Sequence, residues 1–257
     1  VVRLVGSEMC IRDRSKDVLI ETISQDLSLG LSAHMIFPVM SDSEKDHEGT
    51  MAADDGMPLQ SAVRDLKEKF GDEILLMTDA CLCTSTDHGH CGLLEGHTIL
   101  NDLSVEKLVE IALSHARAGT DYVCLSDMMD GRVLSVRRSF ENEGFKSTGI
   151  MSYSVKYASS FYGPFREAAS SSPSFGDRSS HQMDVRSDYR EAILEARADV
   201  NEGCDISMVK PGLPYLDVLS EVSSNIERPV AVYNVSGEYS MVCLLYTSDA
   251  ADDIPRG

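Results

Sequence analysis

The chain has 257 residues, of which 42 are acidic and 23 are lysine or arginine, so its formal net charge at pH 7 is −19. Such an acidic surface disfavours nucleic acids and anionic membranes as partners, because both bind basic surface. No apolar run approaches the ~20 residues of a membrane span, no signal peptide is visible, and three of the seven cysteines share one cluster, which favours a reducing cytoplasm over a disulfide framework.

Short apolar runs alternate with amphipathic segments of helical length along the chain. The runs predict six strands, at residues 33–39, 74–80, 122–126, 149–154, 206–209 and 229–235. Nearly continuous apolar strands between helices indicate a parallel sheet with both faces covered. Neither an internal repeat nor a linker is visible, so we expect one domain.

The helices between these runs are marked by start and stop signals. The first helix is indicated by apolar spacing over 59–70, and the second by a cap at Ser104 and a stop at Gly119. The third has apolar spacing from 133 and a stop at Gly144, and the fourth has a cap at Asp188 with Glu191 and a stop at Gly203. A fifth helix has Pro214 in its first turn. The Ser-rich stretch 170–174 is expected to be a loop.

The second run is followed by three thiols, Cys81, Cys83 and Cys91, spaced C-x-C-x7-C. Thiolates are soft ligands for Zn²⁺, and a site with three of them leaves the fourth tetrahedral position open, as catalytic zinc sites do. Two alternatives stay open at this point. One is a structural zinc closed by His88 or His90, and the other is three buried free cysteines.

Two lysines, Lys156 and Lys210, end the fourth and fifth runs. A lone lysine at a strand end is usually a solvated tip. Two ammonium groups at one mouth lower each other's pKa, and burial acts in the same direction, so that one becomes a nucleophile able to form a Schiff base with a ketone. Arg166 and Arg178 offer planar forks for carboxylates, although surface arginines in a mobile loop are the alternative.

The polar residues decide between two fold classes. A closed (β/α)8 barrel needs eight strands, and a six-stranded doubly wound sheet is the alternative, but no glycine-rich nucleotide-binding turn supports the latter. Polar side chains follow one strand after another, and in a barrel the ends of these strands meet at one mouth. These side chains are the cysteines, Asp127 and Asp130, Lys156, Lys210, and Ser236. The sequence therefore predicts an α/β (β/α)8 TIM barrel, incomplete here, with about six of eight strands.

Several segments of the chain resemble the porphobilinogen synthase (5-aminolevulinate dehydratase) family, in that family's order. They are residues 79–92, 126–133, 151–158, 161–166, 175–178, 208–211 and 235–239, and the resemblance spans about 17–241. Ser85 and His181 stand where the family usually has tyrosine. The resemblance implies a zinc-dependent lyase of tetrapyrrole and heme biosynthesis, which condenses two 5-aminolevulinates into porphobilinogen with loss of two waters.

The resemblance also implies a role for each site residue. Lys210 would form the Schiff base with the first substrate, and Lys156 would be a second Schiff-base former or a proton carrier. The three cysteines would hold the catalytic Zn²⁺. The substrate-binding residues would be Arg166, Arg178 and Gln182 for the second carboxylate, Ser236 for the first carboxylate, and Asp79, Ser126 and Asp127 around the first amine.

Two further expectations follow from the resemblance. Glu195, fifteen residues before Lys210, matches the glutamate of an allosteric Mg²⁺ site in magnesium-stimulated members. A single carboxylate suits Mg²⁺, which keeps several waters, although an ordinary exposed helix glutamate is the alternative. The family also suggests a cytoplasmic homo-octamer that binds 5-aminolevulinate and neither nucleic acid nor membrane.

Both ends of the chain read differently from the rest. Residues 1–14 and 245–257 resemble translated cloning sequence, so we expect a partial catalytic barrel over 15–244. The family's first and last strands have no counterpart, which predicts unpaired edges near 33–39 and 229–235, loosely packed ends and an insoluble or inactive chain. The alternative functions are a Schiff-base class I aldolase-like barrel with structural thiols, or an inactive zinc-binding fragment.

Overall fold

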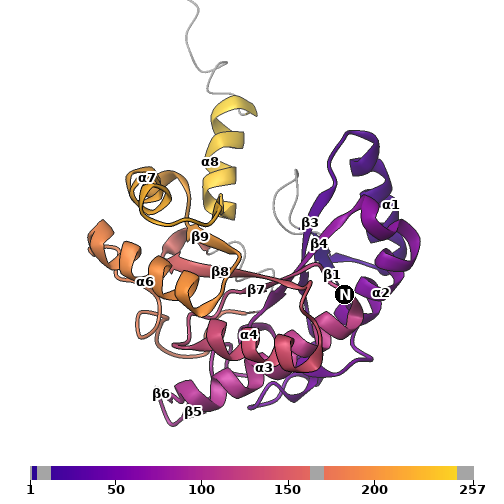
Figure 1. The fold of residues 1–257 in the computed structure, drawn as a ribbon, viewed down its shortest axis with the longest axis horizontal. Helices are drawn as coiled ribbons and strands as arrows, with labels where there is room; N and C mark the ends of the chain where they lie inside the picture. The colour runs from indigo at the N-terminus through magenta and orange to yellow at the C-terminus, as the bar shows by residue number, and fades with distance from the viewer. Residues whose placement is uncertain (1, 5–12, 163–170, 248–257) are drawn as a thin grey trace, which may run out of the picture.

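The computed structural model describes residues 2–4, 13–162 and 171–247, and its framework is one curved sheet (Figure 1). All six predicted strands are present: β3 Ala33–Pro38, β4 Leu75–Ala80, β7 Tyr122–Leu125, β8 Gly149–Lys156, β9 Ile206–Lys210 and β10 Val230–Val232. They pair in parallel and in chain order. The predicted incomplete barrel is therefore confirmed.

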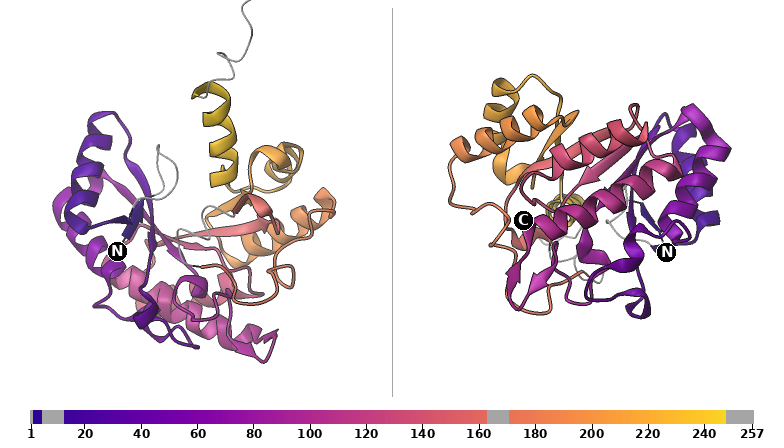
Figure 2. Two further views of the ribbon diagram at one scale, coloured as in Figure 1. Left: turned by 180° about the vertical axis from the view of Figure 1, so that it is seen from behind. Right: turned by 60° about the horizontal axis from the view of Figure 1, so that its bottom comes forward.

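Helices cover the outer side of this sheet (Figures 1 and 2). They are α1 Lys16–Ser28, α2 Pro58–Phe70, α3 Asn101–Ala118, α4 Arg132–Glu143, α6 Tyr189–Glu202 and α7 Leu216–Asn225. A last helix, α8 Ser236–Thr247, stands at the β10 end of the sheet (Figure 1). In the parts of the chain that the structure describes, no helix is both long and apolar enough to cross a membrane.

The two edges of the sheet differ from each other. Strand β1 Val2–Leu4 pairs antiparallel with β3, and β2 Asp13–Arg14 pairs with β1. The prediction of an unpaired edge along β3 is therefore wrong, because the backbone of an N-terminal segment takes up its hydrogen bonds. At the other end, no strand among the described residues pairs with the outer side of β10, and Val232 is 43% exposed. Of the two terminal segments, 1–14 and 245–257, residues 1, 5–12 and 248–257 lie outside the described residues.

The helix termini follow the sequence signals with two exceptions. The stops at Gly119, Gly144 and Gly203 are confirmed, since each glycine closes its helix with a left-handed φ. The Asp188 cap is also confirmed: its Oδ1 accepts from the amide of Arg190 at 2.9 Å. Pro214, in contrast, lies in the 3-10 turn Leu213–Tyr215 just before α7.

The second exception is Ser104, which lies inside α3 and does not cap it. Its hydroxyl donates to the carbonyl of Leu100 at 2.6 Å and accepts from the amide of Leu93 at 2.8 Å. The hydroxyl thus ties the loop after the cysteines to α3. The expected cap is wrong because serine inside a helix can also bond back to the carbonyl four residues earlier, which the local sequence does not distinguish from capping.

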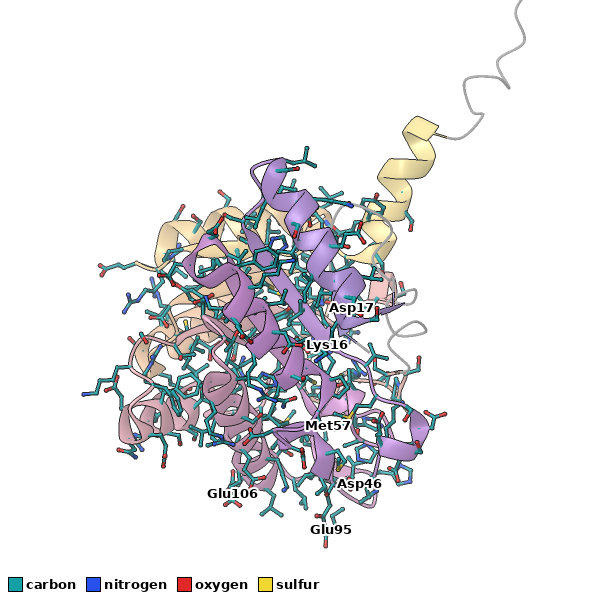
Figure 3. The ribbon with its side chains drawn as sticks, turned by 90° about the vertical axis from the view of Figure 1, so that its right-hand side faces the viewer. Lys16, Asp17, Asp46, Met57, Glu95 and Glu106 are labelled. Carbon is teal, nitrogen blue, oxygen red and sulfur yellow. The ribbon has the colours of Figure 1, made fainter. Side chains whose placement is uncertain are left out.

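Apolar side chains from the helices pack on the sheet in consecutive clusters. Leu19 and Val63 of α1 and α2 cover Ile36 and Leu76, for example, and Phe140 of α4 packs in the next cluster along the sheet. Each such buried side chain contributes about 1.5–3 kcal/mol. Figure 3 shows the side formed by α1 and α2, with Lys16 at the start of α1 and Met57 at the start of α2. Inside the curve of the sheet, Cys124, Met151, Tyr153 and Met208 form a smaller cluster beneath the carboxyl ends of the strands.

Candidate active site

Lys156 and Lys210 are the last residues of neighbouring strands β8 and β9 and are register partners in the ladder. Both side chains are buried, at 5% and 7% exposure. The Nζ of Lys210 lies 4.1 Å from the ring centroid of Tyr233 and 5.2 Å from those of Tyr153 and Tyr162. The fold therefore brings two amines together in an aromatic surrounding.

Burial sets the charge of Lys210. It lowers the pKa of this amine from 10.5 to about 7, and the neighbouring Lys156 acts in the same direction, while Asp79 opposes both. An amine with such a pKa is substantially unprotonated at neutral pH. Lys210 is consequently able to attack a ketone carbon.

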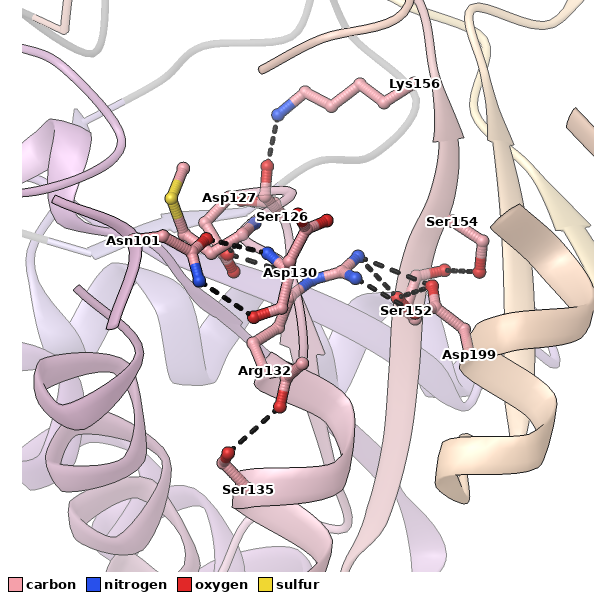
Figure 4. A network of polar contacts seen from close by, with 12 residues as sticks. Asn101, Ser126, Asp127, Asp130, Arg132, Ser135, Ser152, Ser154, Lys156 and Asp199 are labelled. Carbon is pink, nitrogen blue, oxygen red and sulfur yellow. Dashed lines mark hydrogen bonds and ion pairs between the residues drawn. The ribbon is translucent and has the colours of Figure 1, made fainter. Parts of the chain in front are cut away.

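Asp79, near the end of β4, lines the same cavity as the lysines. The cavity measures about 30 Å³ and is also lined by Ser126 and Arg178. Burial raises the pKa of Asp79 to about 6, against the opposing effects of Ser126 and Lys156. The Nζ of Lys156 donates to the backbone carbonyl of Ser126 (Figure 4). The cavity thus holds two basic groups and one carboxyl group that can carry a proton near neutral pH.

The three thiols of Cys81, Cys83 and Cys91 lie together beside this cavity. All three are buried, their sulfur atoms lie within 4.8 Å of one another, and the Sγ atoms of Cys81 and Cys83 are 3.3 Å apart. None is in a disulfide. The short turn Leu82–Thr84 folds the chain back so that the amide of Cys83 donates to the Cys81 sulfur at 3.5 Å. Hydrogen bonds from Cys81 and Cys83 hold the pKa of the Cys91 thiol well below its usual value, and Arg178 adds to this.

The histidines of the same loop bond to backbone groups and not to the thiols. His88 Nδ1 accepts from the amide of His90 at 3.1 Å, so its Nε2 carries the proton and lies 3.3 Å from the carbonyl of His47. His90 Nε2 contacts the carbonyl of Phe175 at 3.2 Å. Neither histidine belongs to the group of donors formed by the three thiols. The geometry therefore favours three protein ligands over a site closed by His88 or His90.

The residues expected to bind the substrate carboxylates differ in whether their side chains already have hydrogen-bond partners. Arg178 is buried, and its guanidinium donates to the carbonyls of Gly89, at 2.9 Å, and of Ser171. Burial acts to lower its pKa, but the three nearby thiols hold that pKa above the ordinary value. Gln182 and Ser236 are buried with side-chain atoms that have no hydrogen-bond partner. Such atoms are costly unless a ligand pairs them. Arg166 lies outside the described residues.

Asp127 does not line the cavity around the lysines. Its Oδ1 accepts from the amide of Met129 at 2.7 Å and lies 3.7 Å from Arg132 Nε. Arg132 also donates to Asp199 at 2.9 Å and to Ser152 at 2.8 Å, and this buried network lies below Lys156 in the view of Figure 4. Arg132, Asp199 and Ser152 were missed at the sequence level. Arg132 lies in the segment 126–133 that resembles the family, but nothing local indicates its partner 67 residues away.

Glu195 lies on a separate groove of about 700 Å³. The groove is also lined by three other carboxylates, Asp130, Asp184 and Glu191. Burial raises the pKa of Glu195, and Asp199 and Asp130 act in the same direction. Among the described residues, these carboxylates do not form a group of donors within 4.8 Å of one another, as the three thiols do.

Comparison with known proteins gives consistent matches. The family model for delta-aminolevulinic acid dehydratase matches residues 6–254. The delta-aminolevulinic acid dehydratase of Methanothermobacter thermautotrophicus is 53% identical over 213 residues, which cover 83% of this chain and 64% of that protein. The Bacillus subtilis protein of the same name is 46% identical over 228 residues, which cover 89% of this chain and 69% of its own length.

A solved structure matches as well. The delta-aminolevulinic acid dehydratase (porphobilinogen synthase) of Toxoplasma gondii, in complex with its reaction product porphobilinogen, superposes with a TM-score of 0.87 at 41% identity. The match covers 93% of this chain and 71% of that one. The chain thus spans roughly two thirds of the length of these relatives, from 64% to 71%.

Proposed function

The chain belongs to the delta-aminolevulinic acid dehydratase family, and from this premise we propose that it condenses two 5-aminolevulinates to porphobilinogen with loss of two waters. The observation that carries the proposal is the pairing of Lys156 with Lys210 on adjacent strands, in a cavity that Cys83 also lines. Two amines beside a group of thiols suit the condensation of two amino ketones. This reaction would make the protein a lyase of tetrapyrrole and heme biosynthesis.

We assign the Schiff base to Lys210, because burial leaves its amine unprotonated at neutral pH. The amine adds to the ketone carbon of the first substrate, the nitrogen loses two protons, and the ketone oxygen leaves as water. Lys156 and Asp79 both line the cavity and supply groups that accept and return these protons. Lys156 could alternatively form a second Schiff base, and the peptide that carries the reduced adduct distinguishes the two roles.

We assign the three thiols of Cys81, Cys83 and Cys91 to a catalytic Zn²⁺. The set fits this ion, since three buried sulfur donors lie within 4.8 Å of one another and the charge of Arg178 stabilises the Cys91 thiolate. Zinc, when bound, polarises a carbonyl or holds the amine of the second substrate. The remaining contacts in the site come from this chain's own side chains.

The carboxylates of the substrates have candidate partners on the chain. We assign Arg166, Arg178 and Gln182 to the second substrate and Ser236 to the first. The support is the unpaired buried amide of Gln182 and the unpaired hydroxyl of Ser236. Around the first amine we assign Asp79, Ser126 and Asp127. The first two line the cavity, whereas Asp127 lies behind it and acts through its neighbour Ser126.

One experiment separates the candidate functions. The purified protein is mixed with 5-aminolevulinate and zinc, and the product is tested for a pyrrole with an acidic aldehyde reagent. The proposal predicts a pyrrole that disappears when zinc is chelated and returns when zinc is restored. A class I aldolase would leave reducible adducts with other keto acids and no pyrrole. An inactive zinc-binding fragment would bind the metal and give neither product.

We further propose that Glu195 holds an allosteric Mg²⁺ and that the protein assembles into a homo-octamer in the cytoplasm. The support for the magnesium site is the position of Glu195 in the family resemblance, together with its place on a groove that three other carboxylates also line. The support for a reducing compartment is that the five cysteines whose side chains the structure describes are free. Glu195→Gln should abolish any stimulation of activity or change of assembly size by Mg²⁺. If wild-type protein shows neither response to Mg²⁺, the glutamate is an ordinary helix residue.

A further inference from the structure

Glu238, in the first turn of α8, has a fully buried side chain that none of the assignments above uses. Its carboxylate accepts from three backbone amides. The amide of Leu213 donates to Oε1, while the amides of Val235 and Gly212 donate to Oε2 at 2.6 Å and 3.3 Å. A buried carboxylate is tolerated only with partners of this kind, so the arrangement is specific.

The three amides require a carboxylate in particular. A carboxylate is a pure acceptor with two oxygens, so one side chain can bind donors on both sides. Glutamine at this position would turn its own NH₂ group toward at least one backbone N–H. Loss of that hydrogen bond leaves a buried donor unpaired.

The amides belong to two segments that the sheet itself does not join. Gly212 and Leu213 follow Lys210 at the end of β9, and Val235 directly precedes Ser236 after β10. The β9–β10 ladder ends at the pair Val209–Val232, followed by one backbone bond from Tyr233 to Val209 at 3.0 Å. Beyond that point, Glu238 connects the two segments.

A second side chain, Tyr162, also bonds to the backbone of Lys210. The hydroxyl of Tyr162 bonds to the carbonyl of Tyr157 at 2.7 Å and to that of Lys210 at 3.2 Å. Phe161, beside Tyr162, packs so closely on Gly237 that a Cβ there would lie 3.0 Å from its ring. The backbone around Lys210 is thus tied both to β8 and to the start of α8.

We propose that Glu238 is a positioning residue that sets the spacing between Lys210 and Ser236. The inference rests on the proposed function, in which Lys210 takes the ketone of the first substrate and Ser236 takes its carboxylate. A fixed spacing selects ketones that carry a carboxylate at the matching distance. Glu238 therefore affects the choice of substrate through the backbone amides that it binds, and it does not itself touch a reacting atom.

The test uses two ketones that differ only in the distal group. Levulinate carries the ketone and carboxylate of 5-aminolevulinate, and butanone has a ketone without the carboxylate. Each is incubated with the purified protein and cyanoborohydride, and the label on the Lys210 peptide is followed by mass spectrometry. Wild-type protein should be labelled faster by levulinate. Glu238→Gln should reduce this preference by about tenfold or more, with butanone labelling unchanged, and Glu238→Asp, which keeps an acceptor-only group, should lose less.

The controls keep the outcomes distinct. Glu227→Gln, the same change at an exposed position before β10, should keep the full preference for levulinate. A folded Glu238→Gln protein that keeps the preference, or that loses both labels equally, overturns the inference. If both Glu238 variants fail to fold, amide exchange in wild-type protein decides: levulinate, and not butanone, should slow exchange at Leu213 and Val235, and equal exchange overturns it. Wild-type protein that labels no Lys210 overturns the proposed function itself.

Discussion

The chemistry at the level of single residues depends on groups whose charge is set by burial. Burial lowers the pKa of the Lys210 amine to about 7 and raises that of the Asp79 carboxyl to about 6. Both shifts favour the neutral form, because a charge is costly away from water. The two groups therefore exchange protons close to neutral pH, a range in which neither titrates as a free side chain.

The low pKa of Lys210 predicts a specific pH dependence. The amine is protonated below its pKa, so the rate of trapping by a keto acid and cyanoborohydride should rise with pH through about 7 and then level off. Lys156→Met removes a positive charge that lowers this pKa, so the midpoint should move upward. Lys210→Met should abolish the label, and Lys146→Met, at an exposed position, should change nothing. A midpoint near that of a free lysine would refute the assignment.

The thiol cluster predicts a loss of metal affinity in a single variant. Cys83→Ala removes one of three sulfur donors, so zinc affinity should fall by at least about 100-fold, and turnover should fall with it. Equilibrium dialysis against a competing chelator measures the affinity directly. Cys124→Ala is the matched control, since Cys124 is equally buried but lies outside the cluster. Unchanged zinc affinity in Cys83→Ala would contradict the site.

Among the elements, β8 is held in place by a buried ion pair between two helices. Arg132 of α4 donates to Asp199 of α6 at 2.9 Å, and Ser152 of β8 donates to Asp199 at 2.6 Å. The two charged side chains are 6% and 5% exposed. The pair therefore joins α4 and α6 to the strand that ends at Lys156, and it fixes where that lysine lies.

Removal of one partner from this pair should be costly. Asp199→Ala leaves the Arg132 charge buried without its main counter-ion, and we expect a loss of about 3–5 kcal/mol in the free energy of unfolding. Urea unfolding measures this value. Asp184→Ala breaks the exposed pair with Arg186 and should leave the unfolding midpoint unchanged. Equal midpoints for the two variants would show that the buried pair does not hold the elements together.

At the scale of the whole molecule, stability depends on histidines that fold in the neutral form. Burial lowers the pKa of His34, His88, His90 and His115, the last to about 3. A group whose folded pKa is lowered destabilises the protein as pH falls below the unfolded value near 6.5, since only the unfolded state takes up the proton. Buried carboxyls such as Asp79, whose pKa is raised to about 6, stabilise the folded protein as pH falls through that value. The effect of one histidine is therefore measured by comparing a variant with the wild-type protein.

His115→Phe isolates one of these contributions. Between pH 7 and pH 5 the wild-type protein should lose about 2 kcal/mol more stability than the variant, because the variant has no proton to take up at this position. Denaturant unfolding at both pH values gives the change in the free energy of unfolding for each protein, and the two changes are compared. His97→Phe, at an exposed histidine, serves as control. Parallel pH profiles for wild type and His115→Phe would mean that His115 is not buried in the neutral form.

The local patterns of the sequence predicted the fold and drew attention to the cysteines and the two lysines of the candidate site. Apolar periodicity located all six parallel strands, and glycines located three helix ends. The cysteines and both lysines stood out because each follows an apolar strand, and the carboxyl ends of parallel strands must meet at one rim. These features depend on residues close together in the chain, so a sequence can express them.

Contacts between distant segments were decided only by the tertiary structure. The pairing of β1 with β3, the turn of Asp127 toward Arg132, and the three amides around Glu238 each join segments with no shared local pattern. The charge state of Lys210 belongs to the same class, because its pKa depends on how completely the surrounding strands and rings exclude water. The sequence by itself predicted the strands and the groups that follow them, while packing decided the spacing, partners and protonation of those groups, since these depend on the position of every neighbour.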